Sequence, residues 1–409
     1  MRFILCLALS LATTILSAQC DGNRFLNRVF PDLSVTSNVQ YGSNTDRNGA
    51  TQALTMDIYE PNGDVAANRP LVVMCHGGFF LSGDKAAPDV VPLSEDLARM
   101  GYVVASINYR MGASTFGNIE NSFAQAVMRA VQDLNAAIRW FRKNAAEDGN
   151  TFGIDTENIF TFGTSAGAFM VLQQAYMDND EIPAFLDTTA PGLTGGVEGE
   201  SGNAGYSSVV KGLVSHCGAM GDNAWIDADE QTPACLFHGQ YDTTVPNDSS
   251  MLTLAGIFPV AVVEGSYPIS ERMTALGIEH CFEINDNVGH VAYLTNQAVY
   301  DSTLSISSNF LAHFVCGIEL DCTYREVLTG NEEVMNSTFK VFPNPANDVL
   351  YLSSDVPSNY TVIDTQGKQV CSGRSAHINT SHLPSGIYLV QMQDNAGQLK
   401  TARIIVSHE

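Results

Sequence analysis

The stretch Phe160-Thr161-Phe162-Gly163-Thr164-Ser165-Ala166-Gly167-Ala168-Phe169 decides the fold. The apolar residues 159–162 predict a buried strand, and residues 168–176 predict a helix. The turn between them has the form G-x-S-x-G, in which small residues permit a sharp bend and leave the hydroxyl of Ser165 accessible. A serine in such a turn is a candidate nucleophile. The rest of the chain should then supply a base, an acid and an oxyanion hole.

Apolar runs and helical periodicities alternate through almost 300 residues around this stretch. Further strands are expected at 33–41, 52–60, 71–75, 102–109, 209–215, 234–237 and 281–284, and helices at 88–100, 123–141 and 291–315. This alternation predicts an α/β domain with a mostly parallel, doubly wound sheet. Residues 187–208, rich in Gly, Ser and Thr, interrupt the pattern and are interpreted as a surface excursion, with a lid as the alternative.

The base that activates a serine is normally a histidine, since its pKa lies near neutrality. His290 follows the last expected strand, where a loop would carry it over the strand ends, and we expect it to be the base. His76, His216 and His238 also lie at strand ends. The first belongs to a glycine-rich turn, and the other two are expected to bond backbone groups in their loops.

The acid should lie between the serine and the base in the chain, after a strand. Asp242 fits, because the strand at 234–237 ends and Gly239 then opens a turn. Its role would be to hold the histidine tautomer and to stabilise the imidazolium. Asp286 is the rival, being closer to the histidine in sequence, and Asp248 is a third candidate.

An oxyanion hole needs fixed backbone N–H groups. Ala166, directly after the serine, would supply one, and the turn His76-Gly77-Gly78-Phe79 would supply the other from Gly78 or Phe79. Phe79, Phe80 and Phe116 are candidate pocket residues, although core packing explains aromatic side chains equally well.

Composition limits the classes of partner. The net charge of −24 opposes binding to nucleic acid, which is itself a polyanion. Residues 1–18 resemble a secretory signal peptide, with Arg2 followed by a short apolar run, and no later segment predicts a transmembrane anchor. Cys6 would leave with the signal. Among the remaining cysteines, Cys316 and Cys322 are expected to pair, and Cys75 is expected to be an inert buried thiol. No Cys/His spacing predicts a metal site.

The end of the chain has a different pattern. Residues 323–337 are interpreted as a linker between a catalytic domain, residues 19–322, and a last domain, residues 338–409. In that last domain, short alternating strands are expected at 349–352, 360–364, 368–371, 386–392 and 400–406, without a helical pattern. They predict a small antiparallel β-sandwich.

Residues 35–315 resemble the α/β-hydrolase superfamily, and within it the secreted carboxylesterases and feruloyl-esterase-like enzymes of the esterase/lipase branch. The motifs that carry the likeness are His76-Gly77-Gly78, Gly163-Thr164-Ser165-Ala166-Gly167, residues 239–246, Gly289-His290 and Ser106-Ile107-Asn108-Tyr109-Arg110. Phe79 stands where a third glycine is common, which leaves the second oxyanion donor open.

The resemblance implies ester hydrolysis through a Ser165 acyl-enzyme, without a cofactor. The substrate would be an extracellular ester, such as an acetylated or feruloylated polysaccharide, a short-chain lipid ester or a polyester. Two alternatives stay open: a serine peptidase or other acyl-transfer enzyme on the same fold, and a catalytically inactive surface binding protein.

The tail resembles the C-terminal sorting domain of type IX secretion in Bacteroidetes. The likeness rests on three blocks in order, Phe342-Pro343-Asn344-Pro345-Ala346-Asn347-Asp348, Asp364-Thr365-Gln366-Gly367-Lys368 and Leu383-Pro384-Ser385-Gly386-Ile387-Tyr388. It implies the type IX machinery as a partner and export across the outer membrane, followed by release or attachment at the cell surface.

Overall fold

The structure is a computed structural model that describes residues 19–229, 231–254, 257–328, 341–352, 358–364, 368–393 and 399–408. The predicted signal peptide and part of the predicted linker lie outside these residues. The chain divides into two compact units, residues 1–331 and 332–409. The exact domain limits stay a prediction.

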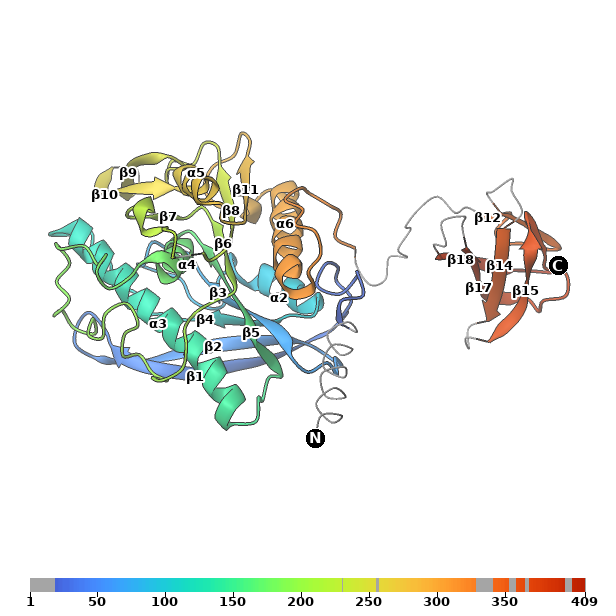
Figure 1. Cartoon of the computed structure of the whole chain (residues 1–409), viewed down its shortest axis with the longest axis horizontal. Coiled ribbons are helices and arrows are strands. Elements are labelled where there is room, and N and C mark those ends of the chain that lie inside the picture. The colour runs from blue at the N-terminus through green and yellow to red at the C-terminus, as the bar shows by residue number, and fades with distance from the viewer. Residues whose placement is uncertain are drawn as a thin grey trace. The chain divides into compact units, whose positions relative to one another are not determined.

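A mixed sheet forms the centre of the first unit (Figure 1). Over the described residues it has eight strands in the order β1-β2-β4-β3-β5-β6-β8-β11. Their bounds are Leu33–Thr45, Thr51–Pro61, Val103–Ile107, Arg69–Cys75, Ile154–Thr164, Gly212–His216, Ala234–Gly239 and His280–Asn285. The strands from β4 to β11 run parallel, whereas β1 and β2 are antiparallel to their neighbours. This is the strand order of the α/β-hydrolase fold, and the predicted fold class is confirmed.

Helices cover both faces of the sheet, so it is doubly wound. Helices α3 (Ile119–Glu147) and α4 (Ala166–Tyr176) bury apolar side chains in one core, together with alternate residues of β3 and β4. On the other face, α2 (Val91–Arg99) and α6 (Gln297–Cys316) form a second core. Helix α3 is the longest of these, and the side chain of Asn118 caps its start by accepting from the Asn121 N–H at 3.1 Å.

The segment between β8 and β11 holds elements that the sequence pattern does not predict. Strands β9 (Ser249–Leu254) and β10 (Phe258–Gly265) form an antiparallel hairpin, which extends the short strand β7 (Ala219–Met220) into a separate sheet. Helix α5 (Ser266–Leu276) follows directly. The helix expected at 291–315 is also shorter, because residues 292–294 form a 3-10 turn before α6 begins.

The excursion at residues 187–208 is held along α3 by side chains of that helix. Four side chains of α3 donate to backbone carbonyls of the excursion over 2.7–3.1 Å. The donors Arg129, Gln132, Asn135 and Arg139 bond to Pro191, Gly196, Val197 and Gly202, in that order. The polar side of α3 thus satisfies the backbone of a segment that lacks helices and strands of its own. This anchoring agrees with a fixed surface excursion better than with a hinged lid.

The expected Cys316–Cys322 disulfide is wrong. The structure instead pairs Cys20 with Cys316 and Cys281 with Cys322. Each of these two disulfides joins residues that are distant in sequence but packed together: the end of α6 lies against the N-terminal segment, and residue 322 returns to β11. Proximity in sequence was therefore a poor guide. Cys75 is a buried free thiol, as predicted.

The second unit is antiparallel, as predicted. In the part that the structure describes, β12 (Val341–Phe342), β13 (Val349–Leu352) and β16 (His377–Asn379) form one sheet. A second sheet has the order β15 (Gln369–Ser375), β14 (Ser358–Asp364), β17 (Gly386–Gln393) and β18 (Leu399–Val406). Side chains of both sheets share one core, including those of Leu350, Ile378, Val362, Val390 and Ile404.

Among the helices that the structure describes, none combines the length and the apolar character that crossing a membrane requires.

Candidate active site

The turn between β5 and α4 holds Ser165 in a strained conformation. Its φ of 54° and ψ of −115° lie in a region that non-glycine residues rarely adopt. The turn is possible because its glycines allow close backbone packing. A Cβ on Gly163 would overlap the carbonyl of Gly167, and a Cβ on Gly167 would overlap the carbonyl of Cys75 at the end of β3. The two glycines of G-x-S-x-G are therefore needed for contact with backbone, and the strain raises the serine above the sheet edge.

Three predicted residues meet at this edge. The hydroxyl of Ser165 lies 2.8 Å from Nε2 of His290, and Nδ1 of the same ring lies 2.7 Å from Oδ2 of Asp242. Because a carboxylate can only accept, Nδ1 carries the proton and Nε2 accepts from the serine. The serine is 7% exposed, whereas the carboxylate is fully buried. The arrangement can remove the serine proton when the hydroxyl attacks an electrophile.

The rival acids lie elsewhere. Asp286 is exposed just beyond β11, and Asp248 is an exposed residue that accepts a hydrogen bond from Ser250 at 2.6 Å. The structure thus brings Asp242 to the histidine, and this residue comes from the loop after β8, as expected from its place in the chain.

Backbone groups and two histidines surround the buried Asp242 carboxylate. Its Oδ1 accepts from the N–H groups of Thr244 and Val245 at 2.8 and 2.9 Å. Burial raises the pKa of Asp242, but hydrogen bonds from His238 and His290 outweigh this effect, and the pKa lies well below its ordinary value. The Asp242 carboxylate therefore stays ionised over the whole range in which a histidine could act as a base.

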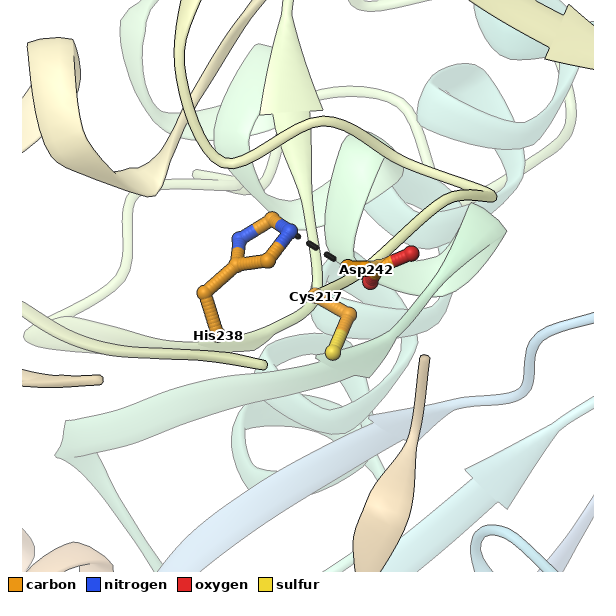
Figure 2. A group of neighbouring side chains, drawn as sticks. All are labelled: Cys217, His238 and Asp242. Atoms are coloured by element: carbon orange, nitrogen blue, oxygen red, sulfur yellow. Dashed lines mark ion pairs between the residues drawn. The ribbon is translucent and has the colours of Figure 1, made fainter. Parts of the chain in front are cut away.

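A second imidazole lies behind the acid (Figure 2). Nε2 of His238 is 3.0 Å from the carbonyl of Val245 and 3.4 Å from Oδ2 of Asp242, while its Nδ1 is 2.8 Å from the hydroxyl of Ser266. Since a carbonyl only accepts, Nε2 carries the proton in the neutral ring and the serine hydroxyl donates to Nδ1. The expected bond of this histidine to loop backbone is present, and its contact with the acid is an addition.

Cys217 completes a group whose ligand-type atoms lie within 4.8 Å of one another, together with His238 and Asp242 (Figure 2). Burial raises the pKa of the Cys217 thiol, so the sulfur stays protonated, and both ring nitrogens of His238 already have partners. These donors are engaged with one another and with backbone. The group fits a packed support behind the acid better than a metal site.

The remaining strand-end histidines are structural in different ways. Nδ1 of His76 lies 2.7 Å from the carbonyl of Gly77, and its ring stacks on Tyr109 at 4.3 Å. For His216 the expected backbone bond is wrong: in the described part of the chain neither ring nitrogen has a partner. The ring packs between Phe237 and Tyr293, and burial lowers its pKa to about 3, which keeps it neutral.

The glycine-rich turn after β3 faces Ser165. A Cβ on Gly77 would lie 3.2 Å from the Cβ of Ser165, so this backbone runs directly beside that residue. The Gly77 N–H donates to the carboxylate of Asp89 at 2.6 Å and is therefore occupied. Gly78 and Phe79 follow with φ values of 111° and 56°. None of the hydrogen bonds found among the described residues uses the N–H of Gly78, Phe79 or Ala166.

Some supporting residues were not identified from the sequence. The side-chain carboxylate of Asp89 holds the glycine-rich turn by accepting from the Gly77 N–H. The backbone carbonyl of Asp89 accepts a hydrogen bond from the hydroxyl of Tyr293 at 2.5 Å. That hydroxyl also lies 2.8 Å from the side-chain oxygen of Thr164, the residue before Ser165. No motif marks these residues, because their partners come from distant segments. Of the predicted pocket aromatics, Phe79 and Phe80 pack on Phe123, and Phe116 is 85% exposed.

Two family models match parts of the chain. Residues 56–204 match the BD-FAE family, and residues 340–407 match the secretion system C-terminal sorting domain. The chain carries a BD-FAE segment and a sorting domain. The residues matched to BD-FAE include the glycine-rich turn and the turn that holds Ser165, and the sorting-domain match covers the strands of the second unit. The predicted resemblances are confirmed.

Proteins similar to part of the chain include a cholinesterase and a lipase. Over 107 residues the chain is 37% identical to cholinesterase 2 of Branchiostoma lanceolatum, covering 26% of this chain and 30% of that protein. Over 138 residues it is 33% identical to bile salt-activated lipase of Mus musculus, covering 31% and 21%. The chain thus spans less than a third of these relatives. A solved structure of Thermogutta terrifontis esterase 2, phosphorylated by paraoxon, is 21% identical with a TM-score of 0.49, covering 69% of this chain and 95% of that one.

Proposed function

We propose that this protein is an exported serine hydrolase that cleaves carboxylic esters. The observation that carries the proposal is the continuous line of hydrogen bonds from Ser165 through His290 to the buried Asp242. The esterase relatives support an ester as the substrate class. Because a peptidase could use the same three residues, a panel of peptide substrates is the direct comparison. The sorting domain supports export by the type IX system, followed by release or attachment outside the cell.

In the proposed mechanism the residues act in two stages. His290 takes the proton of Ser165 as the hydroxyl attacks the ester carbonyl, and Asp242 stabilises the resulting imidazolium. The N–H of Ala166 and that of Gly78 or Phe79 donate to the developing oxyanion. The imidazolium then protonates the leaving alcohol. Water repeats the sequence on the acyl-enzyme, which releases the acid and restores the serine.

A fluorophosphonate probe tests the proposal directly, because it reacts covalently with activated serines. We expect stoichiometric labelling of the folded protein, with Ser165 as the modified residue in peptide mass spectrometry, together with hydrolysis of p-nitrophenyl acetate. Prior unfolding in guanidinium should abolish labelling, since activation requires His290 and Asp242 in place. A folded protein that is neither labelled nor active would instead favour the binding-protein alternative.

His238 should act as a positioning residue through the acid. Replacing it by Phe removes a buried N–H that faces the carboxylate, and we expect kcat for p-nitrophenyl acetate to fall about tenfold, the effect of one charged hydrogen bond. Loss of that donor should raise the pKa of Asp242 toward its ordinary value. The carboxylate would still be ionised wherever His290 acts as a base, but one donor fewer would hold it in place. It would then orient the imidazole ring less well, and the loss should appear in kcat rather than in KM.

His238→Gln is the matched control, because its amide keeps an N–H donor near the position of Nε2. We expect it to recover most of the wild-type kcat. If His238→Gln lost as much kcat as His238→Phe, the histidine would only support packing.

A further inference from the structure

We propose that an apolar cavity, one layer of side chains away from Ser165, binds the acyl group of the ester, and that it selects uncharged acyl chains of four or more carbons over acetyl and over anionic chains. This inference rests on the proposed function and names the substrate class of the same site. The cavity has a volume of about 790 Å³ and lies between α3, α4 and the β9–β10 hairpin. Sites of 300–1,000 Å³ usually hold small organic ligands, so there is room for far more than acetyl.

The hairpin supplies exposed apolar side chains to this cavity. Met251 of β9 and Val262 of β10 are cross-strand partners, and both line the cavity although they are 47% and 59% exposed. Phe185, in the loop after α4, lines it too and is 53% exposed. Apolar side chains that stay open to solvent around one hollow indicate a surface that an apolar ligand covers.

The inner wall of the cavity connects to the catalytic turn. Phe169, which lines the cavity, is one helical turn after Ser165, and its N–H donates to the Ser165 carbonyl at 3.0 Å. The ring of Phe123, also in the wall, packs on Phe169 at 5.7 Å and on Phe79 at 5.3 Å. Phe79 belongs to the oxyanion turn. The cavity therefore begins one layer of side chains from the serine, on the side of the oxyanion donors.

This placement distinguishes the acyl group from the alcohol. The leaving alcohol must lie toward His290, because this residue protonates it. The acyl carbon stays bound to Ser165 with its oxygen in the oxyanion hole. None of the residues found to line the cavity comes from the loop that carries His290. By contrast, Phe169 of α4 lines it, and so does Phe123, which packs on Phe79. The acyl chain is thus the part of the ester that points to the cavity.

The charge at the cavity favours neutral chains. Glu120, Glu181 and Asp222 line it, and its described lining has no Lys, Arg or His. An acyl chain that ended in a carboxylate would meet only negative charges while leaving water, which is unfavourable on both counts.

The test compares kcat/KM for p-nitrophenyl acetate, butyrate and octanoate, so that the leaving group is constant. Each buried methylene should raise kcat/KM severalfold, so we expect the wild-type kcat/KM to be about tenfold higher for butyrate than for acetate. Val262→Trp fills the cavity from an exposed position. It should lower kcat/KM for octanoate at least tenfold and leave acetate within about twofold. Ile257→Trp, on the same hairpin but outside the cavity, is the matched control and should change neither.

Charge selection is tested with p-nitrophenyl pentanoate and mono-p-nitrophenyl glutarate, whose chain ends in a carboxylate. We expect the glutarate to be at least tenfold poorer, and Glu181→Gln to narrow this gap. If Val262→Trp does not fold, Ala124→Trp fills the cavity from α3. Equal octanoate-to-acetate ratios in the wild type and the filled variant would overturn the acyl-site assignment while acetate hydrolysis still supports the esterase. No hydrolysis of any ester would overturn the proposed function itself.

Discussion

Replacement of Ser165 by Ala should lower kcat for p-nitrophenyl acetate by about 10⁴- to 10⁶-fold, with little change in folding. The hydroxyl is the only atom removed, and it is the group that Nε2 of His290 contacts at 2.8 Å. Without it, no acyl-enzyme forms, and the oxyanion donors alone leave a small residual rate. A fall of this size corresponds to about 5–8 kcal/mol of transition-state stabilisation. Initial rates at saturating substrate, with fluorophosphonate labelling of the same samples, measure it.

Ser215→Ala is the matched control for this variant. Ser215 lies in β6, next to the nucleophile strand, and its buried hydroxyl has no hydrogen-bond partner among the described residues. Removing it should leave activity and labelling unchanged, because no bond is lost. A Ser165→Ala protein with near wild-type kcat would contradict the proposed nucleophile, and labelling of that variant would locate the reactive residue elsewhere.

The fold was predictable because its strongest signals are local. The apolar run Leu71–Cys75 indicates a strand buried on both faces, and the structure makes it β3, with every residue buried. The candidate site could also be anticipated, since parallel strands end at the same sheet edge. Residues that follow β5, β8 and β11 must therefore converge, and these positions hold Ser165, Asp242 and His290.

Other features depend on contacts that no short segment reveals. The strand Ser249–Leu254 has a polar start and stays partly exposed, so it lacks the apolar alternation of a strand with one buried face. Its antiparallel pairing with β10 makes it a strand. The disulfide prediction was wrong for the same reason, because cysteine pairing depends on which distant segments the fold brings together. The ion pair of Arg110 and Asp133, 23 residues apart, likewise carries no local signal.

Asp133→Ala should lower the free energy of unfolding of the first unit by about 3–5 kcal/mol, the usual cost of leaving one member of a buried ion pair alone. Arg110 and Asp133 are both fully buried, and their charged groups lie 2.8 Å apart. The carboxylate also accepts from the Arg110 backbone N–H at 2.7 Å and from the hydroxyl of Ser201 at 2.6 Å. Arg110 further donates to the carbonyls of Thr45 and Gly192. One ion pair thus joins β1, the end of β4, α3 and the 187–208 excursion.

Tryptophan fluorescence during guanidinium unfolding measures this effect, because both tryptophans of the chain, Trp140 and Trp225, lie in the first unit. Glu95→Ala is the control: it forms an ion pair with Arg99, and the two side chains are 40% and 30% exposed, so the pair should contribute less than about 1 kcal/mol. The double variant Arg110→Met/Asp133→Leu should be more stable than Asp133→Ala, since it leaves no unpaired buried charge. If Asp133→Ala lowered the free energy of unfolding no more than Glu95→Ala does, the Arg110–Asp133 ion pair would not be what holds the excursion against the sheet.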